Sequence, residues 1–443
     1  MKETLASLLD KSLASGAAGA DALIKRGASR EVRLEPGGGV TWTRTAEGGV
    51  ALRVFLRDGA CGFASACGPS PDPGGIDQIV RAALEAARAP APVLALPSGK
   101  PGDGRGLGIF DQRLHAATPA DLEGLLDDAC SEALRADPRV RRLDSASIAA
   151  SSSEVWLANS RGLAGSYRQT LVHLTLSLMG GEGSSSVLVR RSRTARNLAG
   201  FSPALFGDGT ARLVIEALEG RPIDERVYPA LIAPPAAAEI LRAFARTLSP
   251  PGPPRGTEVG SRLLTIIDDG RLPGGIASAP FDGEGVPTRR TTVVERGRFE
   301  GMLHDLSSAA RCSEESSGNG IRVSFRDAPR RMPSNFFIAP GSDTPEDLMS
   351  GLQDGVWIQS LRPAPSVLRR TGEYGSFTAL AAGRRIVDGK PAEAISGMMA
   401  SWPISGLLSG IVGIGNDLAF GFPTGSFGSP SILVGEIGLR SAS

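Results

Sequence analysis

Two hydrophobic periods alternate along the first half of the chain, and together they restrict its fold class. Apolar residues recur at helical spacing from Leu5, from Ile76 and from Leu122, a pattern typical of amphipathic helices. Residues 50–56 and 171–178 instead follow a two-residue alternation, which predicts strands. Helical and extended segments therefore succeed one another along the chain, and we expect an α+β fold.

Capping residues and prolines mark where the elements begin and end. Thr118, followed by proline, is a typical helix start, and Pro234 opens another helical pattern. That second helix must end at residues 249–254, because successive prolines do not continue a helix. Beyond it the chain is rich in glycine, with short β-like runs at 263–267 and 356–358. The last part of the chain is therefore predicted to be β-rich.

The 443 residues are long enough for two or three domains. A loop-like composition around residues 97–104 separates the first helices and strands from the next set. We predict an N-terminal α+β region at 1–100, a middle α+β region at 101–220 and a β-rich C-terminal domain at 221–443.

Charge and cysteine usage exclude several classes of protein. The chain has 48 Lys and Arg against 47 Asp and Glu, a net charge of +1, without the basic stripe of a nucleic-acid or membrane-surface protein. No apolar run is long enough for a membrane helix or a secretory signal. The four cysteines are scattered, with no Cys-x-x-Cys. We expect a cytoplasmic protein that binds neither nucleic acid nor membrane.

The residues that usually carry hydrolytic chemistry are sparse. His115, His173 and His304 are more than fifty positions apart, so none forms a His-Glu-x-x-His zinc motif. His173 is expected to be a hydrogen-bonded sheet residue, and His304 with Cys312 would need further metal ligands from elsewhere. No Gly-x-Ser-x-Gly elbow is present. A hydrolase that uses Cys312 or a serine remains an open alternative.

Two glycine-flanked segments carry the candidate binding groups. Asp282 and Glu284 lie between glycines, which leave carboxylates accessible to a ligand. Ser317 and Asn319 lie in the glycine-rich segment 316–322, which could form an anion-binding backbone nest with Arg322 as its charged partner. Ordinary turns explain both segments equally well.

An ordered series of short motifs resembles the TldD/PmbA family across nearly the whole chain. The motifs are Ile266–Gly270, 281–291, Gly297, Gly301, 317–320, 333–336, Pro340-Gly341, 371–377, 395–397 and 415–417, preceded by 19–22 and 50–65. Each is modest alone, but their order and spacing are specific.

The resemblance implies a cytosolic pair of proteins, of which one is a zinc metalloprotease with a His-Glu-x-x-x-His helix. Counted from Pro234, those positions here hold Arg242, Ala243 and Thr247. Arginine is a permanent cation, alanine has no donor atom and threonine is a poor zinc ligand. No cysteine follows Cys312 to act as the later ligand. The chain therefore resembles the PmbA (TldE) side of the family, which lacks the metal motif.

The resemblance implies a non-catalytic subunit of a complex that degrades or processes unfolded peptides, with zinc in a TldD-like partner and no cofactor in this chain. Its partners would be that subunit and a peptide, in a homodimer or hetero-oligomer. The residues expected near substrate or interface are Asp282, Glu284, Ser317, Asn319 and Arg322. The open alternatives are a homo-oligomeric peptide-binding protein and a stand-alone hydrolase that does not use zinc.

Overall fold

The computed structural model describes residues 1–35, 38–87, 95–249, 251–363, 375–421 and 426–442. Residues 371–374 of the family-like series and Pro250 of the proline-rich run lie outside these ranges. Helices and strands follow one another along the first half, and strands dominate the last part of the chain. The α+β prediction with a β-rich C-terminal domain is confirmed.

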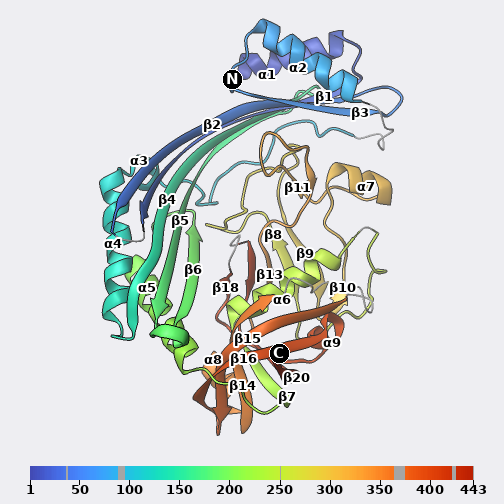
Figure 1. Ribbon diagram of the computed structural model, residues 1–443. Helices are drawn as coiled ribbons and strands as arrows, with labels where there is room; N and C mark the ends of the chain where they lie inside the picture. The colour runs from blue at the N-terminus through green and yellow to red at the C-terminus, as the bar shows by residue number, and fades with distance from the viewer. Residues whose placement is uncertain (36–37, 88–94, 250, 364–374, 422–425, 443) are drawn as a thin grey trace.

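A long six-stranded antiparallel sheet forms the first half of the molecule and bends along its length (Figure 1). Its strand order is β3-β2-β1-β4-β5-β6. The bounds are β1 (Gly19–Leu34), β2 (Val40–Phe55), β3 (Cys61–Cys67), β4 (Val140–Asn159), β5 (Ala164–Gly180) and β6 (Val187–Ala195), with a short 3-10 turn at Gly183–Ser185. Strands from both regions expected at 1–100 and 101–220 thus belong to one sheet.

Two groups of helices cover the same face of this sheet at its opposite ends. At one end α1 (Lys2–Ala14) and α2 (Pro73–Ala86) pack on Ala22 and Ile24 of β1. At the other end α4 (Pro119–Arg135) and α5 (Pro203–Glu219) pack near Val32, beside the short α3 (Gln112–Ala116). Side chains alternate across a strand, so these even-numbered residues share one face. Figure 1 shows the helices on the convex side, with the C-terminal domain on the concave side.

Local sequence explains the helix starts. Thr118 caps α4 through a capping box with Asp121, as its position before a proline predicted. The helix predicted from Pro234 is α6 (Pro234–Thr247). The strand predicted at 263–267 begins later than expected, and β8 covers Ile266–Asp269. Leu264 is part of a turn instead, because its amide donates to the Ser261 carbonyl.

Two further sheets build the C-terminal domain. One has the order β10-β9-β8-β13-β19-β18; the other has the order β16-β15-β14-β7-β20-β17, and β16 also pairs with β20, which closes a ring. The strands are β7 (Arg226–Ile232), β8 (Ile266–Asp269), β9 (Arg290–Glu295), β10 (Arg298–Phe299), β13 (Phe336–Ile338), β14 (Asp354–Pro363), β15 (Ser376–Val387), β16 (Lys390–Pro403), β17 (Ile411–Ile414), β18 (Ala419–Phe420), β19 (Phe427–Ser429) and β20 (Ile432–Ser441). The remaining elements are the pair β11 (Gly320–Ile321) and β12 (Arg330–Arg331), with α7 (Leu306–Cys312), α8 (Pro345–Ser350) and α9 (Ile404–Ser409).

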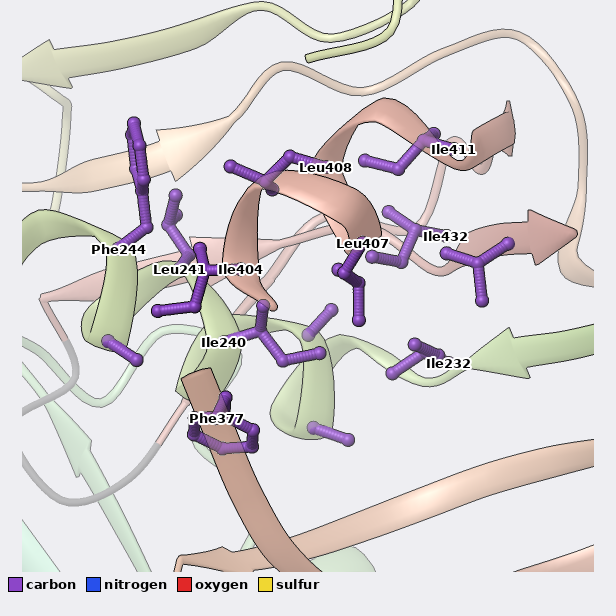
Figure 2. Close-up of a cluster of buried hydrophobic side chains, with 14 of the residues drawn as sticks. Ile232, Ile240, Leu241, Phe244, Phe377, Ile404, Leu407, Leu408, Ile411 and Ile432 are labelled. Carbon is purple, nitrogen blue, oxygen red and sulfur yellow. The ribbon is translucent and has the colours of Figure 1, made fainter. Parts of the chain in front are cut away.

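Helix α6 lies in the core between these C-terminal sheets. Ile240 projects from it toward Leu407 of α9, and Leu241 and Phe244 lie beside Ile404 at the start of α9 (Figure 2). All five side chains are buried. The helix that the family resemblance singled out is therefore a packed central element of this domain.

Candidate functional site

The concave face of the long sheet carries mainly small polar side chains. In the middle of β4, Ala150 points into the core beneath α4 and α5, so Ala149 and Ser151 point to the concave side. Cross-strand register then aligns two lateral rows on that side, Thr43–Glu31–Ala149–His173–Thr194 and Thr41–Arg33–Ser147–Thr175–Ser192. This hydroxyl-rich face looks toward the C-terminal domain (Figure 1).

His173 is held within this face by its neighbours. Its Nδ1 lies 2.9 Å from Thr194 Oγ1 and its Nε2 lies 3.2 Å from Thr175 Oγ1. Thr175 Oγ1 is in turn 2.8 Å from Ser192 Oγ. Partial burial lowers the pKa of the imidazole, because it disfavours the charged form. The expectation of a hydrogen-bonded sheet histidine is confirmed.

A polar cavity of about 420 Å³ lies where the concave face meets the C-terminal domain. The sheet contributes Ser153 and Gln169, whereas Ile276, Ser324 and Phe325 come from C-terminal loops. The cavity is continuous with the concave face, since Ser29 and Ser151 also line it and pair across β1 and β4.

A larger cavity of about 650 Å³ lies on the convex face, in the gap between the two helix groups. Two of its three arginines are paired with acids: Arg26 pairs with Glu154 at 2.7 Å, and Arg326 pairs with Glu47. Arg168 lies over the ring of Phe110, 4.2 Å from its centroid. We therefore regard the smaller, concave cavity as the better candidate binding site.

Three of the predicted site residues belong to one buried ionic network. Arg53 of β2 donates to Asp21 of β1 over 2.7 Å and to Glu284 over 2.7 Å. Arg322 donates to Asp21 and, over 2.8 Å, to the Gly283 carbonyl. Asp282 accepts from the Gly320 amide at 2.8 Å. The network ties the sheet to the C-terminal loops beneath α1 and α2.

Burial governs the ionisation of the two carboxyls in that network. It raises the pKa of Asp282, and the negative charge of Glu284 raises it further. Burial also raises the pKa of Glu284, against the opposing effect of the Arg53 guanidinium. Asp282 and Glu284 are 7% and 1% exposed, so the network faces the protein interior.

Ser317 and Asn319 form a neighbouring buried cluster. Ser317 Oγ lies 2.5 Å from Asn319 Oδ1, and Asn319 Nδ2 donates to Asp268 over 2.8 Å. Asp268 also accepts from the Ser334 amide and hydroxyl. Burial raises the pKa of Asp268 to about 6. The structure thus brings the five predicted residues into adjacent clusters that join loops of the domain.

Sequence reasoning missed Asp21 and Arg53, which complete the network. Both are charged residues within otherwise apolar strand segments, and both are buried. A buried charge is costly unless it is paired, so a charge inside an apolar strand is a signal for a distant partner. That signal does not reveal which residue the partner is.

Three positions on α6 correspond to the metal motif implied by the family resemblance. Arg242 pairs with Glu239, Ala243 is 7% exposed in the core, and Thr247 Oγ1 donates to the Phe244 carbonyl at 2.7 Å. These side chains do not fit a zinc ion, which needs imidazole, thiolate or carboxylate donors. Within the described ranges, no group of three or more His, Cys, Asp or Glu side chains could hold a metal ion.

No described helix is long and apolar enough to span a bilayer.

Comparison with known proteins identifies relatives over most of the chain. The PmbA/TldA metallopeptidase central domain matches residues 113–218, and the C-terminal domain of that family matches residues 225–441. Metalloproteases of Methanocaldococcus jannaschii and Methanothermobacter thermautotrophicus are 35% and 30% identical over 107 and 184 residues. Those matches cover 24% and 41% of this chain and only 24% and 39% of the two relatives. A metalloprotease PmbA homologue of Haemophilus influenzae is 25% identical over 316 residues, 67% of this chain and 70% of that protein.

Solved structures share the fold over almost the full length. A Thermotoga maritima protein described as a candidate modulator of a DNA gyrase has a TM-score of 0.85 at 22% identity, covering 99% of this chain and 100% of its own. TldE from Thermococcus kodakarensis has a TM-score of 0.83 at 20% identity, covering 99% and 100%. Together, the two domain matches establish that this chain belongs to the TldD/PmbA family.

Proposed function

We propose that this chain is the non-catalytic subunit of a cytoplasmic peptidase complex, whose metal site lies in a TldD-like partner. The observation that supports this most directly is the content of α6. The position of the first histidine holds a salt-bridged arginine, Arg242, and that of the glutamate holds a buried alanine, Ala243. Neither Arg242 nor Ala243 can bind zinc or activate a water molecule.

The concave face gives the subunit a role beyond completing the assembly. Its rows of serine, threonine and histidine side chains present both donors and acceptors. Such a surface can hydrogen-bond the backbone of an extended chain with little dependence on its sequence. We therefore assign the face to peptide contact, as one wall of a chamber that the partner would close. Zinc and bond cleavage belong to the partner.

In this proposal the five residues of the two clusters stabilise the arrangement of the loops and do not contact the substrate. Glu284 and Arg322 fix the C-terminal loops against the sheet, and Asn319 fixes the segment before β11 to β8. The burial of these side chains keeps them away from a peptide on the open concave face.

Association with a zinc-motif relative from the same organism tests the proposal. The two purified proteins should form a stoichiometric complex when mixed, as measured by size-exclusion chromatography with light scattering. A mixture that stays separate, while this chain alone oligomerises and binds peptides, would contradict the proposal. That result would favour the homo-oligomeric peptide-binding alternative.

A further inference from the structure

Two cations reach the concave cavity from different strands of the sheet. Lys25 lies on β1, and Arg196 directly follows β6, with β4 and β5 between them. Both side chains line the same space of about 420 Å³. Two positive groups at one polar cavity repel each other, so the arrangement costs free energy unless a negative charge is bound between them.

Arg196 is a buried cation without an acidic partner. The residue is 7% exposed, and its guanidinium donates, among the described residues, to the backbone carbonyls of Gly275, Ile276 and Thr170. No carboxylate in the described part of the chain lies within ion-pair distance of it. Burial lowers the pKa of Arg196 to about 10, as expected when a charged form is poorly solvated. Its charge is thus held in place but not neutralised.

Lys25 is also without a partner. It is half-buried, and across the described ranges its ammonium group makes no hydrogen bond or ion pair. Burial lowers the pKa of Lys25, and the charge of Arg196 lowers it further, against the opposing effect of Glu47. Glu47 is the acidic residue that lines the cavity, and it is already paired with Arg326. The cavity therefore has an excess of positive charge.

The remaining walls suit one end of an extended chain. Phe325 packs over Gly49, where an added Cβ would lie 2.1 Å from its ring, and Gly49 is the cross-strand neighbour of Lys25. Gln169 Nε2 donates to Ser153 Oγ at 3.0 Å, which leaves the serine proton free for an acceptor. The concave face leads directly to this place through Ser29 and Ser151.

We propose that the cavity formed by Lys25, Arg196 and Ser153 binds a carboxylate of the peptide that lies on the concave face. The carboxylate is either the peptide's C-terminus or an acidic side chain. It supplies the counter-charge that Arg196 and Lys25 lack. This inference rests on the proposed peptide-binding role of the concave face. It adds that the bound peptide carries a carboxylate at the position of this cavity.

Fluorescence anisotropy with labelled extended peptides tests the site in the full chain. Four peptides of one sequence distinguish a C-terminal carboxylate from a side-chain carboxylate. They are a free acid, its C-terminal amide, and both forms with one internal Gln replaced by Glu. A peptide carrying the preferred carboxylate should bind the wild-type protein about tenfold more tightly than its neutral counterpart. Lys25→Met should abolish most of that difference. Lys2→Met, which removes an equal charge from exposed α1, should retain it.

A second measurement keeps the test independent of folding effects in a variant. The chain has five lysines, so amine acetylation of each can be followed by mass spectrometry. The acid peptide should slow acetylation of Lys25 and leave Lys2 and Lys100 unaffected. Equal binding of all four peptides, without protection of Lys25, would overturn the carboxylate site and leave the peptide role intact. If no peptide binds in any form, the peptide-contact role of the concave face fails as well.

Discussion

Arg53 Nη1 donates to Glu284 Oε1 over 2.7 Å and joins strand β2 to a loop 231 positions later in the chain. Both side chains are almost fully buried. Glu284 also accepts from the Leu306 amide at 2.7 Å, where α7 begins. One ion pair thus holds the long sheet, the 281–287 loop and α7 in a fixed arrangement. This arrangement sets how the concave face is presented to the C-terminal domain.

Removing the acid of this pair should destabilise the protein strongly. Among the described residues, Glu284→Gln leaves the buried Arg53 guanidinium with Asp21 as its one counter-charge. We expect a loss of about 3 kcal/mol in the free energy of unfolding. Urea denaturation measures it. The control Glu300→Gln breaks a largely exposed pair with Arg255 and should cost less than about 1 kcal/mol. Similar losses for the two variants would show that the buried network contributes no special stability.

Asp268 should make stability fall as the pH rises. Its pKa is raised by burial from 3.8 to about 6 in the folded protein, so the folded state holds a proton that the unfolded state releases. The stabilising contribution is complete below pH 3.8 and is lost as the pH rises through about 6. The shift corresponds to about 3 kcal/mol.

The pH profile of Asp268→Asn measures this contribution. The variant should be less stable at low pH, and its unfolding free energy should decline less between pH 4 and pH 6.5 than that of the wild type. Asp10→Asn, at an exposed position on α1, is the control and should keep the wild-type slope. A wild-type slope in Asp268→Asn would mean that this carboxyl is ionised throughout the range.

Obstruction of the concave face should weaken peptide binding without unfolding the sheet. Ala149 lies in a lateral row between Glu31 and His173, so Ala149→Arg places a long side chain where a peptide would lie. We expect about a tenfold increase in peptide Kd, or about 1.4 kcal/mol. Ser166→Arg, at an exposed position opposite Trp156 on the convex side, should leave the Kd unchanged. Equal effects of the two variants would remove the concave face from peptide binding.

The thiols should differ in reactivity, and none should be needed for cleavage. Cys130 is 7% exposed and burial raises its pKa to about 12, whereas Cys67 is exposed. Iodoacetamide should therefore label Cys67 first and spare Cys130 in the folded protein. Cys312→Ala should leave the activity of a mixture with the metal-bearing partner unchanged. Cleavage by this chain alone that is lost in Cys312→Ala but not on addition of a chelator would support the stand-alone hydrolase alternative.

Capping residues in the sequence predicted where two helices begin. Helix α5 was not predicted, because its sequence is adapted to close packing against another helix. Thr118 and Pro234 mark the starts of α4 and α6 as the patterns indicated. Gly207 and Gly209 interrupt the apolar period of α5. A Cβ at Gly207 would lie 2.1 Å from the Ala129 carbonyl oxygen. The glycine is therefore explained by the contact between α4 and α5, which a single-sequence pattern does not show.

The sequence predicted part of the buried ionic network but none of the residues that line the concave cavity, for a similar reason. Asp282 and Glu284 stood out as acids between glycines, and the structure places them together with Arg322. The partner Arg53 is 231 positions from Glu284, a separation that no local pattern encodes. The cavity lined by Lys25 and Arg196 was missed as well, because it depends on sheet order and on which face each strand residue occupies.

We propose that this chain needs a metal-bearing partner for peptide cleavage, and a mixing experiment checks this dependence. Cleavage of a labelled unfolded peptide is measured for this chain alone, for a TldD-like subunit alone, and for the mixture with and without a zinc chelator. We expect no cleavage by this chain alone, and chelator-sensitive cleavage by the mixture that is faster than cleavage by the partner alone. Chelator-resistant cleavage by this chain alone would contradict it.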